Sequence, residues 1–389
     1  MPKHKLLLGE NKIATRICFL LFLAVAMAVV NGCTPETNRQ EYIKIGVLLP
    51  LTGEDSDEGL RALNGLQLAK SEINENGGVL GKKLDIIVLN DKGNEEYIVQ
   101  QYNALIEKGV VAIIGSSYSN VTLELAKVSE KDGLPVISPT ASNPNVTKGR
   151  RNVFRAIFTD DYQAEAMAQF ARVSLKAETA LVLRNRNDDG FKHIAEVFAK
   201  SFTDRNGQIT ALEYYTTEND FAALLRKYAS SPPDVIFCPE SHLPAAALVN
   251  TAHEAGFHNT YILGSDAWDG LLAYVYDPEA MDNVYYSAPF SFDDKDAHVS
   301  EFVRNYFRYF SQMPLSGSAA AYTCVYILSH SIDKAGNTDK NDIISAIKAN
   351  EFDMITGRIK YNENNNPRIS VYVIQIKGGE YSTYEKLSL

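Results

Sequence analysis

The chain has 389 residues, of which 38 are basic and 48 are acidic, giving a formal net charge of −10. This length is ample for two domains. The acidic balance argues against a nucleic-acid partner and against broad adhesion to anionic lipid, although it says nothing about the fold.

The first 32 residues have the pattern of an export signal. An uncharged, mostly apolar run over residues 17–30 precedes the small residue Gly32 and then Cys33. This run is too short for a comfortable membrane span and does not end in a charged stop, so an uncleaved signal anchor is the lesser alternative. The basic residues of the leader are Lys3, Lys5, Lys12 and Arg16.

Cys33 directly after Gly32 resembles a bacterial lipobox, in which the cysteine is lipidated and becomes the new N-terminus. Asn31 departs from the usual small or aliphatic residue, which leaves cleavage by ordinary signal peptidase as an alternative. We expect an exported protein, in the periplasm or at the cell surface, that is lipid-anchored to the membrane and has a short polar tether over residues 33–40.

Removal of residues 1–32 leaves 34 basic and 47 acidic residues and a net charge of −13. Two cysteines, Cys238 and Cys324, then remain in the folded body, each within an apolar run. Two cysteines in an exported protein of this size do not make a disulfide framework. We therefore expect buried free thiols.

Strands and helices alternate from residue 42 onward. A first block has predicted strands 42–50, 84–89, 110–114 and 135–138, with helices 60–74, 95–108 and 121–131 between them. A second block has strands 179–183, 209–215, 235–238 and 261–263, with helices 191–206, 221–230 and 245–256. Continuous apolar strands that alternate with helices predict parallel sheets covered by helices on both faces. Two such doubly wound blocks predict two similar lobes.

The last third of the chain adds three predicted helices, 298–310, 318–335 and 340–349. A closing hairpin is predicted after them, with strands 357–361 and 370–377 around an Asn-rich turn.

Several motifs occur in a recognisable order along the whole mature chain. The most specific is residues 69–81, Ala-Lys-Ser-Glu-Ile-Asn-Glu-Asn-Gly-Gly-Val-Leu-Gly, followed by Asp91 beyond the next strand. These motifs resemble the Leu/Ile/Val-binding family of type I periplasmic binding proteins. The other matching segments are 42–53, 113–116, 136–144, 154–155, 221–225 and 354–357.

The resemblance implies an architecture, a Venus-flytrap of two doubly wound parallel-sheet α/β lobes joined by three crossings. A ligand is held in the cleft and enclosed by hinge closure. We place the crossings near Phe158, Ala288 and Gly357. Lobe one is then 41–158 plus 289–356, and lobe two is 159–288 plus 357–389.

The resemblance also suggests ligand contacts, one position at a time. Ser119, Thr140 and Ser142 fall where the family holds the α-carboxylate of a ligand, and neutral donors at a helix N-terminus suit an anion. Asp266 falls where an acidic residue meets the ammonium group. From the residues alone, these four side chains are ordinary helix-cap and turn residues.

Three positions depart from the family pattern, which often has aromatic residues there. They hold Glu58, Asp189 and Ser241, and this replacement disfavours a branched aliphatic ligand and favours a polar or cationic one. The alternative is that loop insertions shift the alignment, so that Tyr118, Trp268 or Phe290 line the pocket instead.

The sequence lacks the motifs of several other kinds of site. The sequence has no phosphate-binding P-loop, no Gly-x-Gly-x-x-Gly after the first strand and no zinc or nucleophile-elbow motif. We expect no cofactor and no metal, and an enzyme is a remote alternative. The prediction is a monomeric solute-binding lipoprotein that delivers a small polar or amino-acid-like ligand to the membrane permease of an ABC importer. A sensor that reports to a receptor or regulator is the alternative.

Overall fold

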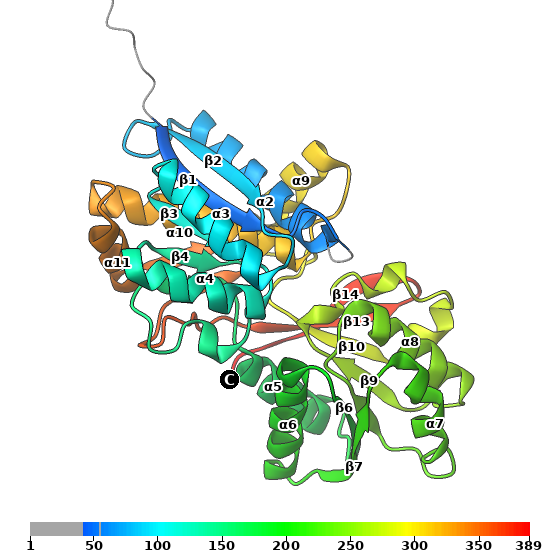
Figure 1. Ribbon diagram of the computed structural model, residues 1–389. Coiled ribbons are helices and arrows are strands. Elements are labelled where there is room, and N and C mark those ends of the chain that lie inside the picture. Colours follow the sequence, from blue (N-terminus) through cyan, green and yellow to red (C-terminus); the bar gives the residue numbers. More distant parts are fainter. Residues whose placement is uncertain (1–41, 54–55) are drawn as a thin grey trace, which may run out of the picture. The chain divides into compact units, whose positions relative to one another are not determined.

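A computed structural model of the chain describes residues 42–53 and 56–389. The predicted export signal, the tether and Cys33 lie outside the described residues. The described chain forms one five-stranded sheet, one seven-stranded sheet and a separate two-stranded sheet. Figure 1 shows the two large sheets with the helices that flank them, and we call each large sheet with its helices a lobe.

The five-stranded sheet of lobe one has the order β2-β1-β3-β4-β5, and all its pairings are parallel. Its strands are β1 (Tyr42–Leu49), β2 (Lys83–Asn90), β3 (Ala112–Gly115), β4 (Val136–Ser138) and β5 (Val153–Arg155). The helices that pack on it are α2 (Ser56–Glu75), α3 (Glu95–Glu107), α4 (Ser119–Asp132) and α10 (Ser316–Ala335). Helix α9 (Ala297–Phe310) packs on α2, and α11 (Lys340–Ala349) packs on α10.

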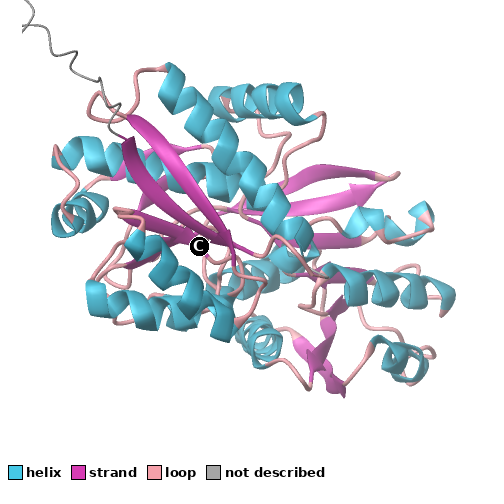
Figure 2. Ribbon diagram, turned by 45° about the horizontal axis from the view of Figure 1, so that its top comes forward, coloured by secondary structure: helices cyan, strands magenta, loops and turns pink. Residues whose placement is uncertain are grey.

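Successive buried residues of lobe one face opposite layers, because side chains alternate along a strand. Val47 belongs to the same apolar cluster as Leu66 of α2 and Val325 of α10. Its neighbour Leu48 belongs to the cluster of α3 and α4. The sheet is therefore covered on both faces, as the unbroken apolar strands predict, and Figure 2 shows helices flanking the strands.

The seven-stranded sheet of lobe two has the order β14-β13-β10-β9-β8-β6-β7. Its strands are β6 (Thr179–Asn185), β7 (Gln208–Tyr215), β8 (Val235–Phe237), β9 (Tyr261–Gly264), β10 (Val284–Ala288), β13 (Val371–Lys377) and β14 (Glu380–Leu387). The pairings from β7 to β10 are parallel, and β13 is antiparallel to both β10 and β14. Its helices are α5 (Asp160–Gln169), α6 (Asp189–Asp204), α7 (Phe221–Arg226) and α8 (His242–Glu254).

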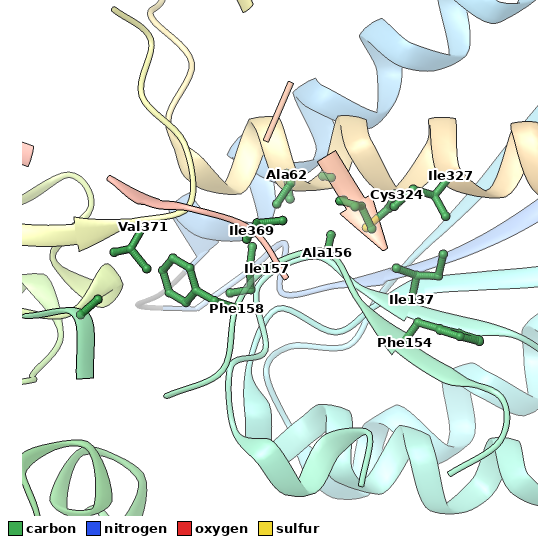
Figure 3. Packing of buried hydrophobic residues seen from close by; sticks show 14 of the residues in the cluster. Ala62, Ile137, Phe154, Ala156, Ile157, Phe158, Cys324, Ile327, Ile369 and Val371 are labelled. Atoms are coloured by element: carbon green, nitrogen blue, oxygen red, sulfur yellow. The ribbon is translucent and has the colours of Figure 1, made fainter. Parts of the chain in front are cut away.

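The chain passes between the two large sheets three times, over residues 156–159, 289–296 and 361–370. The first and third crossings share one apolar cluster, in which Phe158 and Ile369 are both buried. Figure 3 shows Ile157 and Phe158 close to Ile369 and Val371. The predicted lobe boundaries are compatible with this path and stay a prediction.

The predicted closing hairpin is wrong. Strand β12 (Gly357–Lys360) pairs with the strand that precedes it, β11 (Glu351–Met354), in an antiparallel two-stranded sheet. Strand β13 instead enters the large sheet of lobe two, where it gains a partner on each side and buries most of its length. The turn after β12 is held separately, because the buried Asn365 side chain donates to the carbonyl of Val153 at 3.0 Å.

Other predicted elements differ mainly at their ends. Helix α2 starts four residues earlier than expected and α7 ends four residues earlier. The prediction left out β5, α5, β10, β11 and β14, which are short or lie in segments without a strong period. Cys238 and Cys324 are buried free thiols, as predicted.

Candidate functional site

The carboxyl ends of the strands are where doubly wound sheets bind ligands, and in lobe one this edge is lined by hydroxyl groups. Helix α4 begins at Ser119, four residues after β3 ends, and Tyr118 at its N-cap makes no side-chain capping hydrogen bond. The first amides of a helix lack partners within the helix and carry a partial positive charge. This edge therefore suits an anion.

The loops after β3 and β4 are tied to each other. Ser119 Oγ accepts from the amide of Asn143 at 3.2 Å, and Thr140 Oγ1 donates to the carbonyl of Ser117 at 3.0 Å. The hydroxyl of Ser117 is buried and has no hydrogen-bond partner among the described residues. Ser119 and Thr140 thus lie in adjacent loops at one edge.

Asp91, the motif residue after β2, holds the loop after β3 in place through its buried carboxylate. Its carboxylate accepts from Ser116 Oγ at 2.6 Å and from the amide of Gly93 at 2.9 Å. Burial raises the pKa of Asp91, and these two hydrogen bonds oppose the rise. Because the side chain is fully buried, its role is to fix the loop after β3.

The corresponding edge of lobe two carries carboxylates, held by the amide of Gln163 on α5. Gln163 Nε2 donates to Asp160 Oδ1 at 3.2 Å and to Asp266 Oδ1 at 2.9 Å. Gln163 Oε1 accepts from the amide of Asp266 at 3.0 Å and from Ser287 Oγ at 2.7 Å. One buried side chain therefore fixes two acids from different elements.

Burial raises the pKa of Asp266 to about 7, and the neighbouring carboxylate of Asp160 adds to the rise. Asp269 and Glu58 raise it further, whereas the hydrogen bond from Gln163 lowers it. Burial also raises the pKa of Asp160, although the hydroxyl of Ser142 and the charge of Arg155 oppose this. Clustered carboxylates with a raised pKa favour a cation between them.

Hydrogen bonds connect the two edges in a continuous path. The carboxylate of Asp160 is hydrogen-bonded to the side chain of Ser142, and its amide donates to the carbonyl of Ser142 at 3.0 Å. Ser142 precedes Asn143, whose amide donates to Ser119. The path from Asp266 through Gln163 and Asp160 to Ser142 and Ser119 brings acids and neutral donors together.

Glu58 lies at the start of α2 and is paired with Arg61 at 3.2 Å. Its carboxylate also lies against α10, since a Cβ on Gly317 would be 2.4 Å from Glu58 Oε1. Burial alone would lower the pKa of Arg61, but Glu58 and Asp269 outweigh it and the pKa is raised. Asp269 of lobe two in turn accepts from the amide of Ser316 at 2.7 Å, which links the lobes.

Asp189 and Ser241 both follow strands of lobe two, and their surroundings differ. Asp189 opens α6 with a fully exposed side chain, and Lys192 lies 3.8 Å from it. Ser241 is half-buried at the start of α8, and its amide donates to Glu240 Oε1 at 2.9 Å.

The structure thus brings five of the seven predicted ligand residues close to one another, namely Ser119, Thr140, Ser142, Asp266 and Glu58. Their roles as ligand contacts stay a prediction. Sequence reasoning missed Asp160, Gln163, Arg61 and Glu240. The segment Asp160–Gln163 follows the first crossing directly, and two polar residues three apart at a helix start are a signal that pattern reading treats as capping.

Of the three aromatic alternatives, Trp268 and Phe290 are buried, whereas Tyr118 is half-buried next to Gly93. Trp268 is fully buried and its ring packs on Gly264, where a Cβ would be 2.1 Å from it. Phe290 is buried in the cluster of α9 and α10.

Across residues 42–53 and 56–389, no group of three His, Cys, Asp or Glu side chains is arranged to hold a metal ion. In the same ranges, no helix combines the length and the apolar character needed to cross a membrane.

Comparison with known proteins identifies the family. The sequence model of the periplasmic binding protein family matches residues 42–380. A Leu/Ile/Val-binding protein of Rhizobium johnstonii is 28% identical over 331 residues, covering 82% of this chain and 88% of that protein. The leucine-, isoleucine-, valine-, threonine- and alanine-binding protein of Pseudomonas aeruginosa is 25% identical over 381 residues, with 94% of each chain covered.

Solved structures agree with this. The leucine-binding protein of Thermotoga maritima has a TM-score of 0.80 and 27% identity, covering 89% of this chain and 99% of that one. A branched-chain amino acid transporter substrate-binding protein of Streptococcus pneumoniae, solved with isoleucine, has a TM-score of 0.81 and 25% identity, covering 90% and 100%. With its two α/β lobes and a family match over nearly all its described residues, the chain belongs to the periplasmic binding protein family.

Proposed function

We propose that this protein binds an amino acid between its two lobes and delivers it to the membrane permease of an ABC importer. The relatives named above are amino-acid-binding proteins, and one is the substrate-binding protein of a branched-chain amino acid transporter. Membership of the periplasmic binding protein family supports a role in binding a solute outside the cytoplasm.

The observation that carries the proposal is the hydrogen-bonded path between the two edges. It joins the carboxylates of Asp266 and Asp160 to the hydroxyl groups of Ser142 and Ser119. An amino acid is a zwitterion, so its ammonium group suits the carboxylates and its carboxylate suits the neutral donors at α4. Thr140 is proposed as a further contact for the ligand carboxylate, because its hydroxyl donates to the carbonyl of Ser117 in the loop that precedes Ser119.

The mechanism follows from the position of the ligand. A ligand that contacts both edges stabilises the closed arrangement of the lobes more than the open one, and only this difference shifts the population. Ser142 and Asp160 are bonded to each other across the first crossing, so a ligand that enters competes for groups that are already paired. Closure thus exchanges internal hydrogen bonds for ligand bonds.

The proposal includes export and a lipid on Cys33, which hold the protein at the membrane near the permease. These steps depend on residues 1–33, and the sequence pattern is their support. The acidic mature chain, with 47 acidic and 34 basic residues, is kept at the membrane by the lipid and not by charge. Mass spectrometry of the protein from its own host tests this, and an N-terminus without acyl chains contradicts the lipid.

The ligand can be identified from freshly purified protein. We expect denaturation to release an amino acid, chemically unchanged, and a thermal-shift screen of amino acids to raise the melting temperature for the same compound. X-ray scattering should then show a smaller radius of gyration with the ligand. Conversion of the compound to a product, or no shift with any amino acid, contradicts the proposal.

A further inference from the structure

The polar side chains at the edge of lobe two extend beyond Asp266. We propose that Glu240, oriented by Asn185, forms a second subsite of the same cleft, which binds the cationic side chain of a basic amino acid. This inference rests on the proposed function, because it assumes that the α-amino group of the ligand is held at Asp266.

The strand register puts the three residues in one row. Val182 of β6 is paired with Phe237 of β8, and Phe237 is paired with Leu263 of β9. Asn185, Glu240 and Asp266 each lie three residues beyond these partners. The paired strands are about 4.8 Å apart, and the three residues follow the carboxyl ends of these three neighbouring strands in the order of the sheet.

Glu240 is buried, with 3% of its surface exposed, and its hydrogen-bond donors are all neutral. Its Oε2 accepts from Asn185 Nδ2 at 2.6 Å and from the hydroxyl of Tyr215 at 2.5 Å. Its Oε1 accepts from the amide of Ser241 at 2.9 Å. A carboxylate has room for a further donor.

The nearby arginines are engaged with other groups. Arg184 Nη1 lies 3.6 Å from Glu196, and Arg184 and Arg186 both stack over the ring of Tyr214. The ion pair of Arg184 is with Glu196, and the hydrogen bonds to Glu240 come from an amide side chain, a hydroxyl and a backbone amide. A buried carboxylate without a counter-charge is costly, so a ligand cation would stabilise it.

A second observation points to a ligand at this edge. The hydroxyl of Ser265, directly before Asp266, is 1% exposed and has no hydrogen-bond partner within the described part of the chain. A buried polar group without a partner costs free energy, and a polar ligand would satisfy it. The edge therefore offers an unpaired hydroxyl directly before Asp266 and, at the end of the neighbouring strand, a carboxylate whose hydrogen-bond donors are all neutral.

Such a row offers a separate carboxylate to each of the two cationic groups of a basic amino acid. The α-ammonium group is held by Asp266, and the side chain extends along the row toward Glu240. An apolar side chain in the same place would leave the buried negative charge of Glu240 without a counter-charge. The edge therefore favours lysine, ornithine or arginine over leucine.

Isothermal titration of the wild-type protein with lysine, ornithine, arginine, leucine and isoleucine tests the inference without any variant. We expect the tightest basic amino acid to bind roughly 10- to 100-fold more tightly than leucine, the range of one charge-assisted hydrogen bond. Tighter binding of leucine or isoleucine than of every basic amino acid overturns the subsite and leaves the proposed function intact. Binding of no amino acid at all contradicts the proposed function itself.

The variant Glu240→Gln keeps the size of the side chain and removes its charge. We expect it to lose most of the preference for the basic ligand while the affinity for leucine changes less than about threefold. The matched control is Glu218→Gln, because Glu218 is exposed after β7. Equal weakening of all ligands, or a lower melting temperature with unchanged selectivity, shows that Glu240 only holds the strand ends together and overturns the inference.

Discussion

The carboxyl edges of the two large sheets differ in the charge of the groups that they carry. The edge of lobe one is lined by neutral hydroxyl and amide donors near Ser119 and Thr140. The edge of lobe two carries Asp160 and Asp266, bridged by Gln163. Under the proposed function, the two edges are the two halves of a site for a zwitterion, and the chemistry of each half depends on loop residues just past the strands.

Gln163→Leu should have the largest effect on the edge of lobe two, because it removes the hydrogen bonds from Gln163 to Asp160 and Asp266. Asp160, Asp266 and Ser287 each lose a partner, and we expect the free energy of unfolding to fall by about 3 kcal/mol. Urea denaturation measures this. Gln208→Leu, at an exposed position of β7, should change it by less than about 0.5 kcal/mol. Equal losses in both variants would show that the bridge is unimportant.

Asp266→Ala tests the charged half directly. Loss of a charge-assisted hydrogen bond should weaken an amino-acid ligand by about 2 kcal/mol or more, which is roughly 30-fold in Kd. Titration calorimetry with the amino acid found in the protein gives this value. Asp282→Ala, at an exposed position before β10, is the control. Unchanged affinity in Asp266→Ala means that the ammonium group is bound elsewhere.

The pH dependence of binding sharpens the comparison, because the pKa of Asp266 is raised to about 7. A ligand cation binds the ionised form, so the affinity should be about tenfold weaker at pH 6 than at pH 8. Asp160, Asp269 and Glu58 are the other carboxylates that act on this group. Asp266→Asn should flatten the profile, and a flat wild-type profile would contradict the assignment.

The ligand-free protein should show the opposite trend in stability. The folded-state pKa of Asp266 lies above the unfolded value of about 3.9, so the native state holds more protons between these two values. Its contribution to stability is therefore present below pH 4 and is lost as the pH rises to 7. Ligand removes this penalty, and melting curves with and without ligand should diverge as the pH rises.

Ser119→Ala tests the neutral half and should have the smallest effect. Loss of one neutral hydrogen bond costs about 1 kcal/mol, or roughly fivefold in Kd, which is less than the loss at Asp266. Ser345→Ala, exposed on α11, serves as the control. A larger loss at Ser119 than at Asp266 would reverse the order of the two edges.

Much of this fold could be predicted from the sequence, because its strands are continuous apolar runs with helices between them. The hairpin after residue 357 could not, since β13 pairs with the distant strand β10, as in Val284 with Ile376, and local turn chemistry does not reveal this pairing. The family motifs pointed to Ser119, Thr140, Ser142 and Asp266. Gln163 and Glu240 required the register and the side-chain contacts, because a buried polar residue has the same local pattern whether it holds a loop or a ligand.

The apolar cluster that passes through the first and third crossings has a further consequence. It contains Ile45 of the five-stranded sheet, Phe237 of the seven-stranded sheet and Phe158 between them. Neither half can expose its share of this cluster to water without destabilising the other. The mature protein should therefore melt in a single cooperative transition, and either half expressed alone should aggregate.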